Sequence, residues 1–114
     1  MQAHSTLHTD ESIAYKFIEN NKRLVIAGDM DYDEDIIGFF KDADILIVEC
    51  SYGNNYKVKG HLIPKECGEI AQKANVKKLI LTHLYPILKE VRREEAKELF
   101  QNTLMAEDLM DIEL

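Results

Sequence analysis

Three short, uninterrupted apolar runs limit most strongly the folds that this chain can adopt. The runs are residues 24–27, 45–48 and 79–81, and β-branched side chains are frequent in them. Runs of this length without a polar residue are typical of strands inside a sheet that is covered on both faces. Segments with helical patterns separate the runs, so the sequence predicts an α/β domain in which helices cover the sheet.

The other alternating segments complete one mixed sheet with flanking helices. Residues 12–18 alternate apolar and polar side chains, which predicts a partly exposed strand. A turn at residues 19–22 joins it in a hairpin to residues 24–27, and this second strand is expected to be buried on both faces. The alternation in residues 109–114 predicts a further exposed or edge strand.

Three helices are expected between the strands. Asp33 is a good N-cap for a short helix through Phe40, because its carboxylate can accept backbone N–H groups of the first turn. Pro64 suits the first turn of a helix that runs to about Ala74, and residues 88–102 carry the longest helical pattern. The predicted order is β-β-α-β-α-β-α-β.

The composition indicates one soluble domain with a single core, because the chain has only 114 residues. Its net charge of −7 argues against a surface that binds nucleic-acid phosphates without specificity. No apolar run is long enough to span a membrane and the first residues lack a secretion signal, so a cytoplasmic protein is expected. Cys50 and Cys67 fit no metal-ligand spacing and are expected to be buried, reduced thiols.

Asp29, His61 and His83 are the candidate functional residues. Asp29 and His83 follow predicted buried strands, and His61 lies in the loop between two of them. Catalytic groups gather at the carboxyl ends of strands in α/β sheets, so Asp29 and His83 are expected to line one cleft. Spacing alone leaves other roles open, because Asp29 can cap a helix or form a turn and His83 can bind a backbone carbonyl.

The acidic stretch after Asp29 also has to be tested against a calcium loop. Asp29, Asp31 and Asp33 alternate like the first three ligands of such a loop. Glu34 and Phe40, however, stand where the loop needs glycine and a bidentate glutamate. The sequence therefore does not predict a calcium site.

Five phrases of the sequence form an ordered set of motifs: HTDESIAYKFI, LVIAGDMDY, ADILIVECSY, GHLIPKECGEIAQKANVKKLILTHLYP and MAEDLMDIEL. They contain Gly-Asp after a strand, Gly-His-Leu-x-Pro before a helix and Leu-Thr-His at a strand end. In order and spacing they resemble the C-terminal half of metallo-β-lactamase-fold hydrolases close to ribonuclease Z. The resemblance covers nearly the whole chain and implies half of an αββα sandwich.

The resemblance implies a role for each candidate residue. In the family the Gly-Asp carboxylate bridges two metal ions, usually zinc, and the histidine after the last core strand ligates one of them; Asp29 and His83 match these positions. His61 matches a histidine that assists phosphodiester cleavage in RNA-processing members. Met30 and Ile63 stand where the family usually has threonine, so two hydroxyls that could support the site are missing.

The family's remaining metal ligands belong to an N-terminal half that this sequence does not contain. That half carries the His-x-His-x-Asp-His motif and a further ligand histidine. Residues 1–114 are therefore expected to form a single domain, the C-terminal half of the fold. A catalytic zinc ordinarily takes three protein ligands, so two ligands predict weak or absent zinc binding and no activity in the chain alone.

Two functions remain open on this basis. The first is the C-terminal portion of a metal-dependent hydrolase, a phosphodiesterase or ribonuclease Z-like enzyme with a phosphoester or RNA substrate. The alternative is a non-catalytic half-fold module that dimerises or binds a partner. Either way, the inner face of a lone sheet, including Ile26, Ile47 and Ile80, is expected to be exposed, which predicts a homodimer or a complex with a missing N-terminal half.

Overall fold

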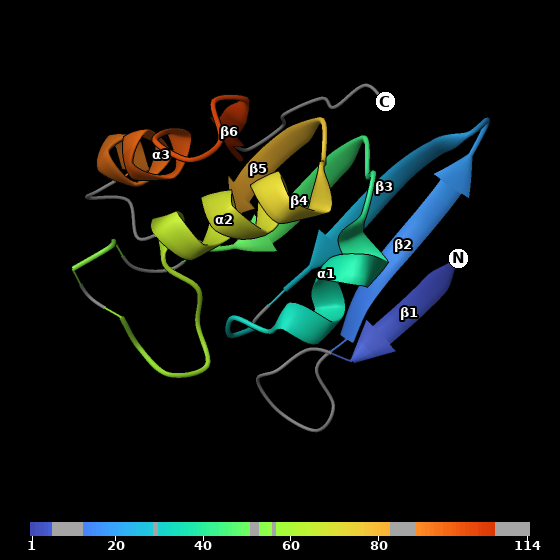
Figure 1. Cartoon of the computed structure of the whole chain (residues 1–114), viewed down its shortest axis with the longest axis horizontal. Coiled ribbons are helices and arrows are strands. Elements are labelled where there is room, and N and C mark those ends of the chain that lie inside the picture. Colours follow the sequence, from blue (N-terminus) through green and yellow to red (C-terminus); the bar gives the residue numbers. More distant parts are fainter. Residues whose placement is uncertain (6–12, 29, 51–52, 56, 83–88, 107–114) are drawn as a thin grey trace.

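The computed structural model describes residues 1–5, 13–28, 30–50, 53–55, 57–82 and 89–106. Within these ranges the secondary structure follows the order β-β-β-α-β-α-β-α-β (Figure 1). The elements are β1 (Gln2–Ser5), β2 (Ile13–Glu19), β3 (Lys22–Ala27), α1 (Glu34–Phe40), β4 (Ile45–Glu49), α2 (Pro64–Ala74), β5 (Lys78–Thr82), α3 (Lys89–Lys97) and β6 (Thr103–Met105).

The six strands form one mixed sheet in the order β1-β2-β3-β4-β5-β6. The first three strands pair antiparallel, and the pairs from β3 to β6 are parallel. Ala27 and Leu81 are both in register with Val48, which lies between them. β3, β4 and β5 therefore point the same way and end at one edge of the sheet, which we call the carboxyl edge.

The local signals in the sequence explain the hairpin and the first two helices. Asn20 and Asn21 both have positive φ angles, 53° and 64°, as a two-residue hairpin turn requires. Asp33 caps α1, since its Oδ1 accepts the backbone N–H of Asp35 at 3.0 Å. Pro64 occupies the first turn of α2, where its missing N–H costs nothing.

All three helices lie on one face of the sheet (Figure 1). The core is the layer between that face and the helices, and β3, β4 and β5 contribute alternate side chains to it. Its largest fully buried members include Val25, Ile36, Phe40, Leu46, Leu62, Ile70, Leu79 and Leu81. The structure thus confirms an α/β domain with one mixed sheet and flanking helices.

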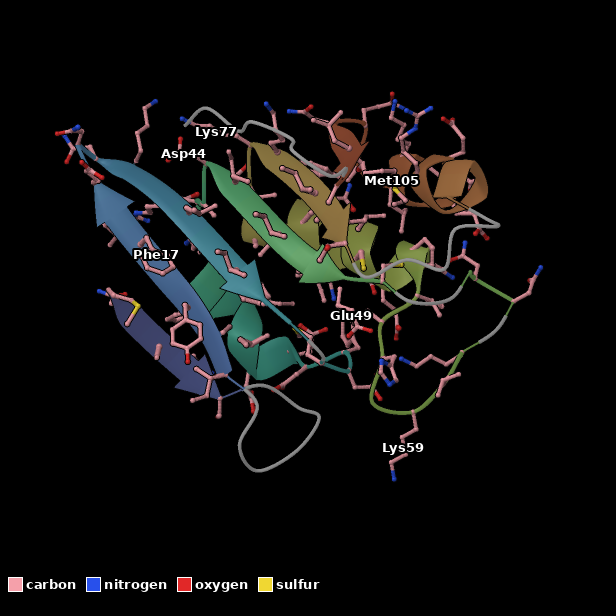
Figure 2. The ribbon with its side chains drawn as sticks, turned by 180° about the vertical axis from the view of Figure 1, so that it is seen from behind. Phe17, Asp44, Glu49, Lys59, Lys77 and Met105 are labelled. Atoms are coloured by element: carbon pink, nitrogen blue, oxygen red, sulfur yellow. The ribbon has the colours of Figure 1, made fainter. Side chains whose placement is uncertain are left out.

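No helix of the described part of the chain lies on the opposite face of the sheet (Figure 2). Ile13, Tyr15 and Phe17 on β2 project from this uncovered face and are exposed, as is Ile18 at the end of the strand. The prediction that residues 24–27 are buried on both faces is wrong, because Ile26 is 38% exposed. An apolar run alone does not reveal whether a second layer covers the strand.

The exposure of the uncovered face is uneven along the sheet. Ile47 is half-buried, and Ile80 is only 1% exposed, so the expectation that Ile80 lies open to water is wrong. The antiparallel end of the sheet is therefore the more exposed part. No helix among the described residues is long and apolar enough to span a membrane.

Two strands differ from the sequence-based order. β1 was not predicted, and β6 begins at Thr103, directly after residues that were expected to continue the last helix. α3 ends at Lys97, and the Asn102 side chain then donates to the carbonyl of Lys77 at 2.6 Å, which holds the chain beside β5. The strand predicted at residues 109–114 lies outside the described residues.

Candidate active site

A buried carboxylate and a half-buried imidazole meet at the carboxyl edge of the sheet. Glu49 is the last residue of β4 and is 1% exposed. His61, in the segment before α2, places its Nδ1 3.0 Å from Glu49 Oε1. Because a carboxylate accepts hydrogen bonds, this contact assigns the proton of the neutral ring to Nδ1 and fixes the orientation of the ring.

The backbone around His61 is held by hydrogen bonds on both sides of the residue. The His61 N–H donates to the carbonyl of Val58 at 3.1 Å, and the Gly60 N–H donates to Asp31 Oδ2 at 2.8 Å. Gly60 has a φ of 91°, a conformation that a residue with a Cβ rarely adopts. Leu62, on the other side, is fully buried in the core. These contacts hold the backbone of the loop that carries the His61 imidazole in one conformation.

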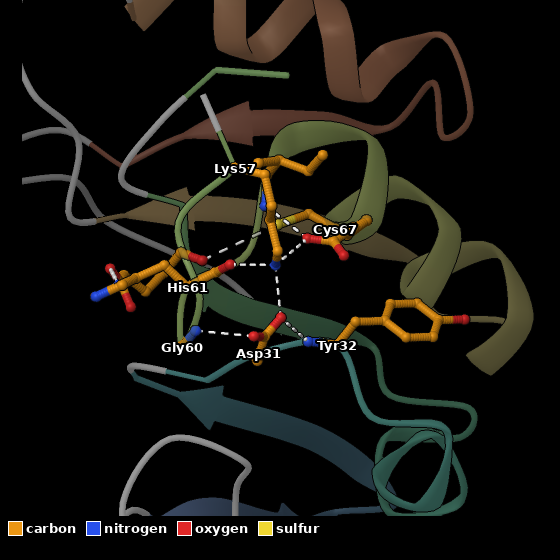
Figure 3. A network of polar contacts seen from close by, with 9 residues as sticks. Asp31, Tyr32, Lys57, Gly60, His61 and Cys67 are labelled. Atoms are coloured by element: carbon orange, nitrogen blue, oxygen red, sulfur yellow. Dashed lines mark hydrogen bonds and ion pairs between the residues drawn. The ribbon is translucent and has the colours of Figure 1, made fainter. Parts of the chain in front are cut away.

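Lys57 connects this loop to two other segments (Figure 3). Its Nζ lies 2.5 Å from Asp31 Oδ1 and 2.8 Å from Glu66 Oε1. Burial opposes the ionisation of Asp31, but hydrogen bonds from Lys57, Gly60 and Tyr32 outweigh it and lower the pKa of the carboxyl. Burial likewise opposes the charge of Lys57, yet the two carboxylates raise the pKa of its ammonium group. Both groups are therefore charged at neutral pH.

The first turn of α2 completes the support of the loop. Glu66 Oε1 accepts the backbone N–H of Ile63 at 3.1 Å, which is one half of a capping box. The other half needs a hydroxyl on the residue before the helix, and Ile63 has none. Asn54 Oδ1 accepts the backbone N–H of Lys65 at 2.8 Å. The missing threonine of the Gly-His-Leu-x-Pro segment thus costs α2 one capping hydrogen bond and leaves the loop anchored.

The structure describes one of the three predicted site residues. His61 lies at the carboxyl edge beside Glu49, and its catalytic role stays a prediction. Asp29 and His83 lie outside the described residues, and their predicted approach stays a prediction. The strands before them do have the required arrangement, since Ala27 and Leu81 occupy matched positions two strands apart. That separation is about 10 Å across the sheet.

Sequence reasoning missed three residues of the site: Glu49, Lys57 and Asp31. For Glu49 a signal existed, because it is a charged residue at the end of an apolar run, and such a residue is seldom buried unless it is paired. Asp31 had been weighed only as a calcium ligand. Nothing in the local pattern around Lys57 indicated that three segments would converge on its side chain.

The two cysteines lie beneath this site, and both are buried thiols that form no disulfide, as predicted. Burial and then the neighbouring Cys50 thiol raise the pKa of Cys67. Such a thiol is a poor nucleophile, because the reactive form is the thiolate. Among the described residues, no three His, Cys, Asp or Glu side chains are grouped so that they could hold a metal ion.

Residues 2–84 match a family model described as the beta-lactamase superfamily domain. The match covers most of the chain and includes β1 to β5 and the loop that carries His61. The chain belongs to the beta-lactamase superfamily. The fold and the resemblance to its metallo-β-lactamase branch are thereby confirmed.

Relatives in this superfamily include ribonuclease Z of Archaeoglobus fulgidus, which is 39% identical over 100 residues, covering 82% of this chain and 33% of the relative. Ribonuclease Z of Gemmatimonas aurantiaca is 37% identical over 100 residues, with 82% and 32% covered. The chain therefore spans about a third of the length of these curated relatives.

Solved structures of the superfamily show the same half-fold. The metallo-β-lactamase-fold protein YhfI of Bacillus subtilis superposes with a TM-score of 0.85 at 29% identity, over 92% of this chain and 44% of that one. The short form of human tRNase Z superposes with a TM-score of 0.74 at 23% identity, over 95% and 40%, which shows a shared fold.

Proposed function

We propose that this chain is the C-terminal portion of a metal-dependent hydrolase of the ribonuclease Z type, which cleaves a phosphodiester. The observation that carries the proposal is the His61 imidazole, held by the buried carboxylate of Glu49 at the carboxyl edge of a metallo-β-lactamase fold. The identity of 39% to a ribonuclease Z supports a phosphodiester as the substrate class.

His61 is proposed to donate a proton to the leaving oxygen or to polarise the phosphate. With Nδ1 bonded to Glu49, the imidazole exchanges protons with a substrate through Nε2. Glu49 Oε1 lies 3.0 Å from the ring nitrogen Nδ1, so it holds the imidazole in one orientation. Because the ring is only partly buried, a substrate can approach it from the solvent side.

The metal of this family does not fit the described residues alone, because they contain no ligand cluster. Asp29 and His83 are proposed to supply two ligands, with the others coming from an N-terminal half. The bound metal would provide an activated water. A catalytic zinc ordinarily needs three protein ligands, so the chain alone is expected to bind zinc weakly and to be inactive.

An assay with a generic phosphodiester, bis(p-nitrophenyl) phosphate, tests this proposal. The 114-residue chain is assayed with zinc, with and without a supplied N-terminal half that carries His-x-His-x-Asp-His. Activity is expected only with both halves, and His61→Ala should lower kcat by about a hundredfold or more. His4→Ala is the matched control, since His4 lies on the edge strand β1 against Phe39 and should leave kcat unchanged.

Two results would contradict the proposal. One is hydrolysis by the chain alone at the rate of the assembled halves, and the other is inactivity of a well-folded, zinc-loaded assembly. The second result would favour the alternative, a non-catalytic half-fold module that dimerises or binds a partner. The uncovered, partly apolar face of the sheet is the observation that supports this alternative (Figure 2).

A further inference from the structure

Lys57 is the point at which three separate segments of the site are joined. Its Nζ lies 2.5 Å from Asp31 Oδ1, 2.6 Å from the carbonyl oxygen of His61 and 2.8 Å from Glu66 Oε1. These acceptors belong to the segment after β3, the His61 loop and the first turn of α2, in that order (Figure 3). An ammonium group has three N–H donors, so the number of donors matches the number of acceptors.

Two of the three acceptors, Asp31 and Glu66, have a second function in the same site. Asp31 also accepts the backbone N–H groups of Gly60 and Tyr32, both at 2.8 Å. Glu66 also accepts the N–H that opens α2. Asp31 stands two residues after Asp29 in the sequence. Lys57 therefore ties the His61 backbone to the segment that follows Asp29.

This arrangement argues against a direct role of Lys57 in binding a phosphate. A lysine beside a phosphodiesterase site would ordinarily be assigned to the substrate. Here all three donors of Lys57 already have protein acceptors at 2.5 to 2.8 Å. A phosphate would have to displace one of them. The side chain is also only 37% exposed, and Asp31 and Glu66 are less so, at 18% and 20%.

We propose that Lys57 is a positioning residue that holds the imidazole of His61 against Glu49 and fixes it relative to the segment that contains Asp31. This inference rests on the proposed function for its catalytic consequence, but the placement of the ring can be measured without activity. A purely structural lysine would contribute stability and leave the His61 ring unchanged. The two interpretations therefore differ in a spectroscopic readout.

Lys57→Met removes the ammonium group and keeps most of the side chain. Lys59→Met is the matched control, since Lys59 lies two residues further along the same loop and is exposed. The first readout is ¹⁵N NMR of the His61 ring in the metal-free chain. We expect the single Nδ1–H tautomer to become a mixture in Lys57→Met, and amide exchange at Gly60 to become about tenfold faster. Lys59→Met should change neither.

The second readout is hydrolysis of bis(p-nitrophenyl) phosphate by the chain assembled with an N-terminal half. A misplaced imidazole should lower kcat by about tenfold to a hundredfold with KM within about twofold. Lys57→Arg keeps the positive charge, so unlike Lys57→Met it should retain most of kcat and the single Nδ1–H tautomer of His61. If Lys57→Met does not fold, Asp31→Asn weakens the same link from the other side and should show the same changes in smaller measure.

The outcomes separate the two proposals. An unchanged His61 ring in folded Lys57→Met would overturn the positioning role, whatever the activity. A raised KM with unchanged kcat would overturn it as well and would assign Lys57 to the substrate. If neither the natural sequence nor any variant hydrolyses the phosphodiester, the proposed function fails, and the ring signals still decide whether Lys57 positions His61.

Discussion

A carboxylate that is 1% exposed is costly unless its partners compensate for the lost water, and Glu49 is such a group. Its contact with His61 is therefore part of what makes the end of β4 stable, as well as a way to orient the imidazole. Glu49 is covered by the loop that carries His61. A substitution of Glu49 is therefore expected to change both the orientation of the imidazole and the stability of the fold at the end of β4.

Glu49→Gln tests the charge of this pair with little change in shape. The amide oxygen can still accept a hydrogen bond from Nδ1, so the fold should persist, with a loss of unfolding free energy of about 1 kcal/mol or less. In the assembled enzyme kcat should fall by about a hundredfold or more, because an amide can also donate to Nδ1 and so no longer fixes the Nδ1–H tautomer. Circular dichroism and the phosphodiester assay measure the two effects.

Glu69→Gln is the control for this substitution. Glu69 lies on the surface of α2, where it makes a long contact of 4.0 Å with Lys73. An unchanged kcat in Glu49→Gln, with Glu69→Gln also unchanged, would show that His61 does not depend on the carboxylate.

At the scale of single residues, the sequence pattern singled out His61, whose catalytic role stays a prediction, and left Glu49 unnoticed. The histidine stands in a motif with a fixed order of residue types. The glutamate becomes part of the site only when a loop folds back so that two residues 12 positions apart meet at the end of a strand. Lys57 shows the same limit, since its acceptors come from three segments.

At the scale of elements, α2 lies close to α3 and the residues that follow it at Gly68. A Cβ at this position would lie 2.8 Å from the carbonyl oxygen of Ala96 and 3.1 Å from Leu99 Cβ. Gly68→Ala should therefore lower the unfolding free energy by about 1–3 kcal/mol, because backbone has to move. Thermal unfolding followed by circular dichroism measures the loss.

Gly38 in α1 provides the opposite case. A Cβ there would have nothing within 4 Å, so Gly38→Ala should raise the unfolding free energy by up to about 1 kcal/mol through helix propensity. Equal effects of the two substitutions would mean that α2 and α3 do not pack as closely as the structure shows.

Asp44 joins the beginnings of three strands and makes the stability depend on pH. Its Oδ2 accepts the backbone N–H of Arg23 at 2.8 Å, and its Oδ1 lies 3.0 Å from Lys77 Nζ. The Arg23 N–H and then Lys77 lower the pKa of the Asp44 carboxyl. A lowered pKa in the folded state means that the charged form stabilises the fold above the ordinary pKa, and that this stabilisation is lost as the pH falls through the folded value.

Asp44→Asn should therefore lower the unfolding free energy by about 1 kcal/mol near pH 7. The difference from the natural sequence should shrink towards zero in acid, where Asp44 is itself protonated. Urea unfolding at pH 7, 5 and 3 provides the comparison. A difference that persists at full size at pH 3 would show that the charge is not its cause.

Elements with their own local signals could be predicted from the sequence, and elements that depend on pairing could not. The hairpin turn at Asn20 and Asn21, the cap at Asp33 and the start of α2 at Pro64 all stand where their residue types require. β1 and β6 are short and lack a strand pattern of their own. They exist because a neighbouring strand offers unpaired backbone groups.

At the scale of the whole molecule, the described helices cover one face of the sheet and leave the other uncovered. The apolar runs in the sequence indicated burial, but the second layer that would bury Ile26 is not among the described elements. Ile80 is nevertheless buried, so the open area lies mainly on β2 and β3. The chain covers about a third of its curated relatives, and we propose that an N-terminal half packs on this face.

The isolated chain is accordingly expected to self-associate through the uncovered face at micromolar concentration. Tyr15 and Phe17 on β2 and Ile26 on β3 are each about two-fifths exposed. Figure 2 shows Phe17 on that face, and Tyr15 is paired with Ile26 across the two strands. A symmetric dimer contains the same side chain from both copies, so Phe17→Glu changes the interface at two places and should weaken association by at least about tenfold.

Val58→Glu is the matched control, since Val58 is 40% exposed but lies on the loop before α2. Light scattering across a dilution series measures both variants, and addition of an N-terminal half should compete with self-association. A stable, well-folded monomer at micromolar concentration, or equal effects of the two substitutions, would contradict the expectation that this face is an interface.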